Sequence, residues 1–484
     1  MKAVLALLAP AVASAVSLKS LLGESEISKE MYRSGQVHEA IMSYKMGEWE
    51  KRRVEGAYNS TQYLMALPQP VKCVNGLAVA KQGDPLQTYR CRGLDLQDFK
   101  THAELGSRTG SGSSSWGWTS PEGREFGAIG QADGTAFIEI SKDGRVTYLG
   151  RLPQQSVTSQ WREIRTVKNY FVIGSEAQNH GVQIFDARKL LTVNPATPKT
   201  FSTTSDISLF NGLPVGRTHN IVSFEEKNFA VAVGANPRTD KCKSGLIFID
   251  LSNPARPTSP GCAPGDGYVH DAQCLVYRGP DTRYTGRDVC YGYNEDTLTI
   301  YDVTNKAAAT IISRTSYTGA AYTHQGSVLD PNNQQFLLLD DEYDEEDGVQ
   351  PAADGYPVTY VWDIRSLTAP KQTGIYKSSV RSIDHNQYVY NGLSFQSNYG
   401  AGLRVLDVSS VPRDPTGKGI REVAFFDIFP DDDSQPGGGA VAFTGTWSHY
   451  AGFPSGNILI NTIERGVYIV KNPSVTGQMK GEFA

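Results

Sequence analysis

Short segments in which apolar and polar positions alternate recur along the chain. Each opens with a small or β-branched residue, continues with apolar or aromatic residues, and ends in Asp, Glu or Lys. Alternation with a period of two predicts β-strands, because successive side chains of a strand point to opposite faces. Seven copies occur, at 134–139 (GTAFIE), 181–186 (GVQIFD), 245–250 (GLIFID), 297–302 (TLTIYD), 358–363 (VTYVWD), 402–407 (GLRVLD) and 466–471 (GVYIVK).

The spacing of these copies predicts a β-propeller. Their last residues are 44 to 64 residues apart, which suits blades of four strands with insertions. Strand-like segments at 165–167, 170–173 and 146–153 serve as examples of the first, second and outer strands of a unit, and the repeated segment is the third. We therefore expect an all-β protein, a seven-bladed β-propeller that occupies residues 111–484.

The last blade needs an outer strand from elsewhere, because few residues follow the seventh copy and Pro473 is among them. We expect the segment around Leu94–Leu105 to supply it, within a disulfide-bearing stretch over residues 71–110. Such a closure removes exposed sheet edges.

The N-terminal part has a different character. Lys2, an apolar run and the small residues Ala13-Ser14-Ala15 predict a signal peptide over residues 1–15. Residues 16–70 are expected to form a short helical extension. No other stretch has the ~20 apolar residues of a membrane helix, and the C-terminal end lacks the hydrophobic tail of a lipid-anchor signal. We therefore expect a secreted, extracellular protein without a membrane span.

Composition and charge narrow the functional classes. The 484 residues are 39% hydrophobic and 20% charged, which is typical of a globular protein. The 46 Lys and Arg against 51 Asp and Glu give a net charge of −5 without a basic tract. This balance argues against nucleic acid as a partner.

Six cysteines in an oxidising compartment predict three disulfides, for which the sequence allows fifteen connectivities. The nearest-neighbour choice is Cys73–Cys91, Cys242–Cys262 and Cys274–Cys290. No C-x-x-C motif is present, so thiol redox chemistry is not expected. Asn59-Ser60-Thr61 is an N-glycosylation sequon.

Five of the eight histidines share one position, just before the first strand of a unit: His219, His270, His324, His385 and His449. First strands line the channel of a propeller, so we expect these imidazoles at one mouth of it. The second strand is antiparallel, so its end returns to the same face. Seven acids lie at such ends: Glu176, Glu295, Asp296, Asp340, Asp341, Glu342 and Glu464.

Two interpretations of this set remain open. Each histidine can bond backbone or a neighbouring acid and so join adjacent blades, which is the simpler reading of a repeated residue. Alternatively, imidazole and carboxylate can hold a divalent cation, calcium or a transition metal. A metal site uses three or four such ligands, and His270, His324 and His385 are the best candidates.

Residues 340–347 (DDEYDEED) hold seven acids in eight positions. Clustered carboxylates can bind Ca²⁺. We expect instead a solvent-exposed acidic loop, because the ligand order of an EF-hand is missing.

Several motifs resemble the LVIVD-repeat proteins of the choice-of-anchor B family. They include 116–119 (WGWT), 174–186 (GSEAQNHGVQIFD), 267–274 (GYVHDAQC) and 337–342 (LLLDDE), and the similarity extends from about Cys73 to Val470. The resemblance implies a propeller with varied cell-surface anchors, and this chain has no evident anchor. It implies no reaction and assigns no role to the histidines or acids.

Three functional hypotheses follow. The leading one is a non-enzymatic extracellular binding or scaffold protein, a monomer that recognises a protein or polysaccharide and holds a divalent cation. The alternative is a metal-dependent extracellular hydrolase with its site at the channel mouth. The third is a structural extracellular protein without a small ligand. No P-loop, dinucleotide or zincin motif is present.

Overall fold

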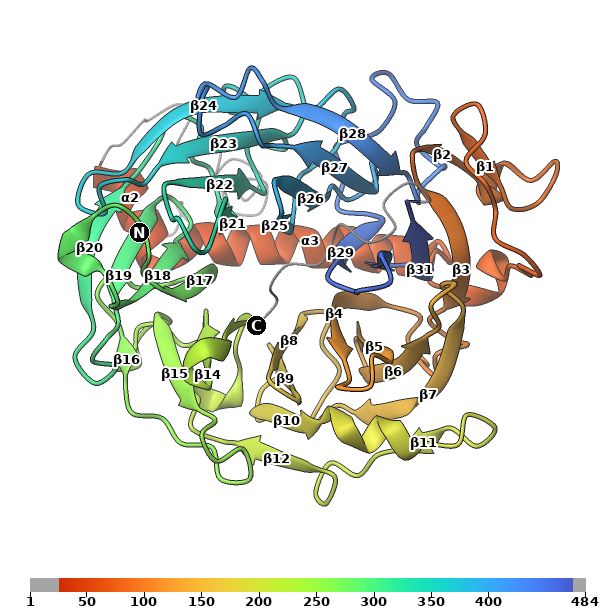
Figure 1. Cartoon of the computed structure of the whole chain (residues 1–484), viewed down its shortest axis with the longest axis horizontal. Coiled ribbons are helices and arrows are strands. Elements are labelled where there is room, and N and C mark those ends of the chain that lie inside the picture. Colours follow the sequence, from red (N-terminus) through yellow and green to blue (C-terminus); the bar gives the residue numbers. More distant parts are fainter. Residues whose placement is uncertain (1–25, 473–484) are drawn as a thin grey trace, which may run out of the picture.

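The computed structural model describes residues 26–472, in which seven β-sheets surround a central axis (Figure 1). The predicted all-β fold, a seven-bladed propeller with short N-terminal helices, is confirmed. The predicted signal peptide lies outside the described residues.

Each blade is an antiparallel sheet in which the first strand lies nearest the axis and the later strands lie progressively farther out. The first blade contains β4 (Gly112–Thr119), β5 (Glu125–Gln131), β6 (Gly134–Ile140) and β7 (Val146–Pro153), and β11 (Lys199–Thr200) pairs in parallel with β7. The second contains β8 (Arg162–Val167), β9 (Tyr170–Ser175), β10 (Val182–Asp186) and β12 (Ile207–Phe210). The third contains β13 (Asn220–Phe224), β14 (Phe229–Val233), β15 (Leu246–Asp250) and β16 (Cys262–Ala263).

The next three blades contain β17 (Asp271–Val276), β18 (Asp288–Tyr293), β19 (Leu298–Asp302), β20 (Thr310–Thr315); β21 (Thr323–Val328), β22 (Phe336–Asp341), β23 (Val358–Asp363), β24 (Lys371–Lys377); and β25 (Gln387–Tyr390), β26 (Leu393–Ser397), β27 (Leu403–Asp407), β28 (Arg421–Phe426), extended outward by β2 (Thr88–Arg92) and β1 (Leu77–Val79). The short helices are η1 (Ser60–Tyr63), η2 (Pro85–Gln87), η3 (Ala187–Thr192), η4 (Pro214–Gly216), η5 (Glu225–Lys227) and η6 (Thr282–Tyr284).

The repeated segment is the third strand of every blade, and the Asp that ends five of the seven copies has a local structural role. Asp250 Oδ1 accepts a hydrogen bond from the backbone N–H of Ser252 at 2.8 Å, and Asp407 does the same with Ser409 at 3.0 Å. Such Asx turns satisfy backbone donors where a strand ends. The acid recurs at this position because its side chain accepts the hydrogen bond of the turn that follows the third strand.

The seventh blade closes the ring with a strand from before the first blade. β29 (Thr446–Tyr450), β30 (Asn457–Thr462) and β31 (Gly466–Lys471) are followed outward by β3 (Asp95–Thr101), which pairs antiparallel with β31. β3 lies in the segment expected to supply the outer strand. Pairing with β3 gives hydrogen-bond partners to backbone N–H and C=O groups of β31 that would otherwise lie at an open edge of the sheet.

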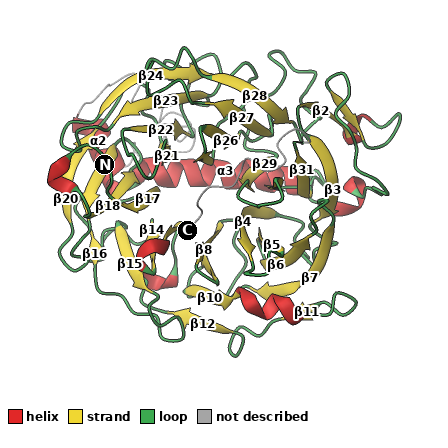
Figure 2. Cartoon of the chain, in the orientation of Figure 1, coloured by secondary structure: helices red, strands yellow, loops and turns green. Residues whose placement is uncertain are grey.

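Within the described residues, two α-helices precede the ring, α2 (Glu26–Ser34) and α3 (Gln36–Val54). Figure 2 shows them in red against the yellow strands, and α3 crosses the middle of the ring in both cartoons. Tyr32, Ile41 and Trp49 of these helices share one apolar cluster with Tyr322 and Trp447 of the blades. The helices therefore pack on the propeller face rather than project from it.

The three disulfides have the nearest-neighbour pairing, Cys73–Cys91, Cys242–Cys262 and Cys274–Cys290. The third joins directly opposed residues of β17 and β18. Three disulfides suggest an oxidising compartment.

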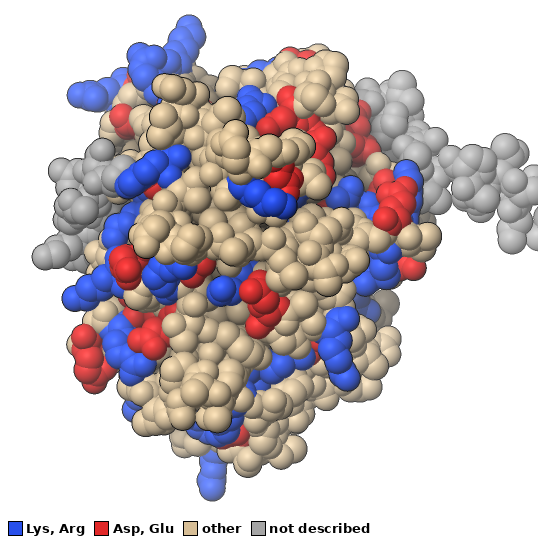
Figure 3. Space-filling view, turned by 90° about the vertical axis from the view of Figure 1, so that its right-hand side faces the viewer, with Lys and Arg blue, Asp and Glu red and all other residues tan. Residues whose placement is uncertain are grey.

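Among the described residues, no helix combines the length and apolar character needed to cross a membrane. Acidic and basic residues are intermixed over the face shown in Figure 3.

We expect Phe99→Ala to destabilise the ring closure. Phe99 is 1% exposed and packs on Tyr468, its partner across β3 and β31, with ring centroids 4.5 Å apart. The loss should be about 3–5 kcal/mol in the free energy of unfolding, measured by urea denaturation. Lys100→Ala on the same strand is the control, with an effect within about 0.5 kcal/mol. Equal effects of the two substitutions would contradict this role of β3.

Candidate functional site

Helix α3 covers the mouth of the channel with one amphipathic face. Its buried residues are Val37, His38, Ile41, Met42, Lys45 and Trp49. Their spacing of mostly three or four residues places them along one side of the helix. Polar contacts hold this side of the helix to the blades: His38 Nδ1 lies 2.6 Å from the Tyr322 hydroxyl, Trp49 Nε1 donates to the Phe443 carbonyl at 2.8 Å, and Arg52 Nε lies 3.2 Å from Glu464 Oε1.

Beneath α3, four of the repeated histidines form a row across four consecutive blades. The ring centroids are 4.3 Å apart for His219–His270 and for His270–His324, and 4.4 Å apart for His324–His385. Each lies at the start of a channel-lining strand, so the repeat of the blades generates the row. The predicted position of these residues at one mouth agrees with this geometry.

Each imidazole in the row is held by a hydrogen bond at Nδ1. The partner is a backbone carbonyl for His270 (His324 O, 2.8 Å) and His385 (Trp447 O, 2.6 Å). It is a carboxylate for His324 (Asp340 Oδ1, 3.1 Å) and His219 (Glu176 Oε1, 2.5 Å).

A carbonyl only accepts, so Nδ1 of His270 and of His385 carries the proton. In a neutral ring Nε2 then has a free lone pair. Burial lowers the pKa of His270 and His324 well below the usual value, and lowers that of His385 to about 4. At neutral pH these rings are uncharged and can act as ligands.

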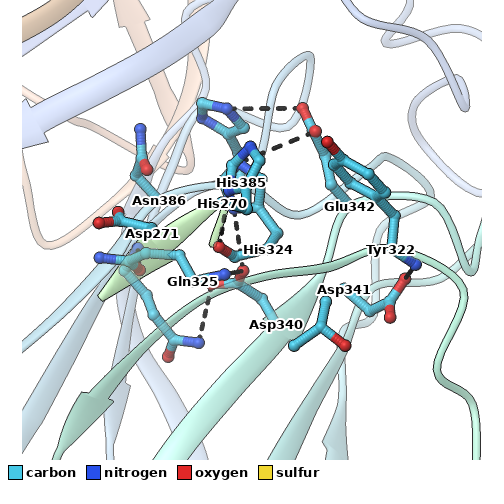
Figure 4. Close-up of polar contacts among 12 residues, drawn as sticks. His270, Asp271, Tyr322, His324, Gln325, Asp340, Asp341, Glu342, His385 and Asn386 are labelled. Carbon is cyan, nitrogen blue, oxygen red and sulfur yellow. Dashed lines mark hydrogen bonds and ion pairs between the residues drawn. The ribbon is translucent and has the colours of Figure 1, made fainter. Parts of the chain in front are cut away.

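Glu342 is the carboxylate at the centre of the group (Figure 4). Its Oε2 lies 3.8 Å from His324 Nε2 and its Oε1 lies 3.5 Å from His385 Nε2. The Tyr399 hydroxyl donates to Oε1 at 2.5 Å. Burial alone would raise the pKa of Glu342, but the charge of Lys45 and further hydrogen bonds outweigh it and lower that pKa.

Lys45 of α3 reaches into the same group. Its Nζ donates to Glu342 Oε2 at 2.5 Å, and the side chains are 3% and 1% exposed. Burial lowers the pKa of Lys45, while Glu342 opposes that shift. A cation thus already neutralises the central carboxylate.

The group has the composition and size of a metal site. One ligand atom each from His270, His324 and Glu342 lie within 4.8 Å of one another, and no other such group occurs within residues 26–472. Two ligands about 2.0–2.1 Å from a tetrahedral zinc ion are roughly 3.4 Å apart, so a small contraction suffices. The adjoining cavity of about 10 Å³, lined also by Lys45 and Trp161, is close to the space of one water.

Other predicted site residues lie apart from this cavity. His449 Nδ1 contacts Ser397 Oγ at 2.8 Å, and its ring packs on Tyr388. Glu295 pairs with Arg238 at 2.7 Å. Asp296 is half-buried and follows Glu295 in the chain. Asp341 accepts hydrogen bonds from the N–H groups of Ala321 and Tyr322. Glu464 accepts hydrogen bonds from the N–H of Gly445 and from Arg52.

The expectation of a solvent-exposed acidic loop at 340–347 is wrong. Residues Asp340 to Glu345 are buried, because the chain after β22 turns under α3 and Tyr343 enters the apolar cluster there. Sequence reasoning also missed Lys45. Its position in step with Val37, Ile41 and Trp49, at intervals of four, was a signal that it lies on the buried face.

No protein-family model matches the chain, and no curated protein matches it in sequence. Fold and site together define its class, a disulfide-bonded seven-bladed β-propeller with a buried group of two histidines and a glutamate.

We expect His449 to stabilise the fold only in its neutral form. Burial, together with the charge of Arg165, lowers its pKa to about 3, below the 6.5 of an unfolded chain. The unfolded state therefore binds more protons between these values, so this contribution is complete above pH 6.5 and is lost as the pH falls towards 3. Relative to His449→Asn, the wild type should lose stability on acidification from pH 7 to pH 4.

Urea denaturation of both proteins at each pH measures the difference, since all other titrating groups are common to them. A difference in unfolding free energy that stays constant with pH would contradict the buried neutral state of His449.

Proposed function

We propose that the protein is a secreted, non-enzymatic binding protein that holds a divalent transition-metal ion at the mouth of its propeller channel. The observation that carries this proposal is the group of His270, His324 and Glu342, whose ligand atoms approach one another while both imidazoles are held at Nδ1. Imidazole nitrogen with one carboxylate favours zinc and similar ions over calcium or magnesium.

The surroundings of the two histidines support a ligand role. His324 contacts Asp340, and His270 donates to a backbone carbonyl. Metal-binding histidines typically have such partners at the second ring nitrogen, which fix the tautomer and the orientation of the ring. His385 and His219 continue the row and provide a further nitrogen ligand.

Lys45 competes with a metal ion for Glu342. Both are cations, and the ammonium is in direct contact with Oε2. Metal binding then requires that Lys45 moves away or gives up its proton, and the lowered pKa of the buried amine favours the second route. The α3 segment in this arrangement limits access to the metal site.

Binding rather than catalysis suits the covered site, because the cavity beside the histidines has room for about one water. The predicted signal peptide and the three disulfides support secretion. Asn59 is exposed, as glycosylation at the sequon requires. The LVIVD-like motifs support membership of the choice-of-anchor B family, and an extracellular protein or polysaccharide is the proposed partner.

One observation favours a second candidate function. Two histidines and a glutamate are also the ligand set of catalytic zinc sites that keep a position open for water. A metal-dependent hydrolase would need α3 to leave the channel mouth for substrate to enter.

We expect one zinc ion per chain by calorimetric titration of the full-length protein. His324→Gln and Glu342→Gln should each weaken zinc binding by at least about tenfold, because each removes a ligand. His102→Gln is the control, since His102 is a buried histidine elsewhere, with Nε2 on the Thr462 carbonyl. Equal zinc affinity of all four proteins would contradict the site.

Lys45→Met should strengthen zinc binding by at least about tenfold, because the competing ammonium is removed while the unbranched apolar part of the side chain is kept. Lys51→Met, at an exposed position of the same helix, should leave the affinity unchanged. Weaker or unchanged binding in Lys45→Met would refute the competition.

The zinc-loaded Lys45→Met protein also separates the two functions. Assays with nitrophenyl acetate and nitrophenyl phosphate should give no turnover above free zinc. Turnover that disappears in the double variant with Glu342→Gln would favour the hydrolase.

A further inference from the structure

A second group of carboxylates lies on the loop after β22, apart from the histidines. Asp344 and Glu345 follow the end of β22, and Asp384 precedes β25 in the neighbouring blade. They are 0%, 4% and 2% exposed. None takes part in an ion pair of the described residues, although ionised carboxylates at such depth are normally paired.

These carboxylates have few hydrogen-bond donors: the Tyr360 hydroxyl donates to Asp344 Oδ2, and their other oxygens have no donor among the described residues. These other oxygens are both oxygens of Glu345, both oxygens of Asp384 and Oδ1 of Asp344. Nearby Asp340 differs, because Gln325 N–H donates to its Oδ1 and Gln387 Nε2 to its Oδ2, both at 2.9 Å. The fold thus supplies donors to Asp340, Asp341 and Glu342, and none to the side chains of Glu345 and Asp384.

Asp344 and Glu345 follow the second strand of one blade, and Asp384 precedes the first strand of the next. Tyr343 and Ile383, which flank them, share one apolar cluster, and Ser382 N–H donates to the Gly355 carbonyl at 3.2 Å. Burial raises the pKa of all three, and neighbouring carboxylates add to this: Asp341 for Asp344, Asp344 and Asp384 for Glu345, and Asp340 and Asp344 for Asp384. Buried carboxylates of this kind are neutralised either by protons or by a bound cation.

We propose that Asp344, Glu345 and Asp384 bind a calcium ion that ties the loop after β22 to the start of the next blade. Oxygen ligands without nitrogen favour a hard cation, and Ca²⁺ accepts irregular arrangements of six to eight oxygens. These ligands differ from those of the transition-metal site proposed at the channel mouth, which are mainly imidazoles.

The ion requires a modest closing of the loop. Within the described chain, only the His270–His324–Glu342 group has three ligand atoms within 4.8 Å of one another, so the carboxylates must turn towards a shared centre. Rotation about the side-chain bonds of Glu345 and Asp384 provides this movement, because no hydrogen bond holds their oxygens.

The site also connects to α3. Tyr44 of α3 donates to Glu346 Oε1 at 2.8 Å, one residue after Glu345. Calcium would therefore order the loop that anchors the helix over the channel mouth.

Terbium luminescence on the calcium-stripped full-length protein tests the proposal. Tyr360, whose hydroxyl donates to Asp344 Oδ2 at 2.6 Å, is placed to sensitise a bound Tb³⁺. We expect a saturable signal at one ion per chain that Ca²⁺ reverses. Calcium at a hundred times its dissociation constant should raise the melting temperature by about 3 °C.

Glu345→Gln and Asp384→Asn should each reduce Tb³⁺ and Ca²⁺ affinity at least about tenfold. Asp354→Asn is the matched control, an exposed carboxylate on the same loop that pairs with Lys377. His324→Gln should leave calcium binding unchanged, which separates this site from the proposed transition-metal site.

Two results would overturn the proposal. The first is a wild-type protein that neither binds Tb³⁺ nor gains stability with Ca²⁺, which would mean that protons alone neutralise the three acids. This measurement does not depend on whether any variant folds. In the second, the wild type binds calcium but all folded variants retain the affinity, and the ion lies elsewhere. Should Glu345→Gln or Asp384→Asn not fold, Asp344→Asn takes their place in this comparison.

Discussion

Lys45 on the buried side of helix α3 meets Glu342, and neither side chain has appreciable contact with water. Separating a buried ion pair leaves an uncompensated charge, which costs several kcal/mol. The position of α3 and the charge state of the channel mouth are therefore coupled. The neutral histidines around Glu342 follow from the same condition, because a second positive charge beside Lys45 would be opposed by burial and repulsion.

One stretch of chain at the end of β22 takes part in two chemically different groups. Asp340 and Glu342 contact the histidines, whereas Asp344 and Glu345 lie with Asp384 at the junction of two blades. Nitrogen ligands with one carboxylate suit a transition metal, and carboxylates alone suit calcium. The turn after β22 thus separates the two groups of side chains.

Helix α3 is an addition to the ring rather than a part of it. Closure depends on β3, which begins forty residues after α3 ends, and α3 has no place in any of the seven sheets. Its anchors are an apolar face and a few polar contacts, those of His38, Lys45, Trp49 and Arg52. The helix can leave the channel mouth without breaking a ladder hydrogen bond of the blades.

The sequence alone determined the architecture, since each third strand carries its own alternation and its terminal acid is set by a local turn. Even the ring-closing strand follows from counting strands. The row of His219, His270, His324 and His385 was predictable because one position of a repeat returns to one place in the ring. Tertiary structure alone decided that His449 stands apart, that residues 340–345 are buried, and that Lys45 reaches Glu342. The last two outcomes depend on how α3 packs across the blades, and the contact of Lys45 with Glu342 joins residues 297 positions apart, so no local pattern names the partner.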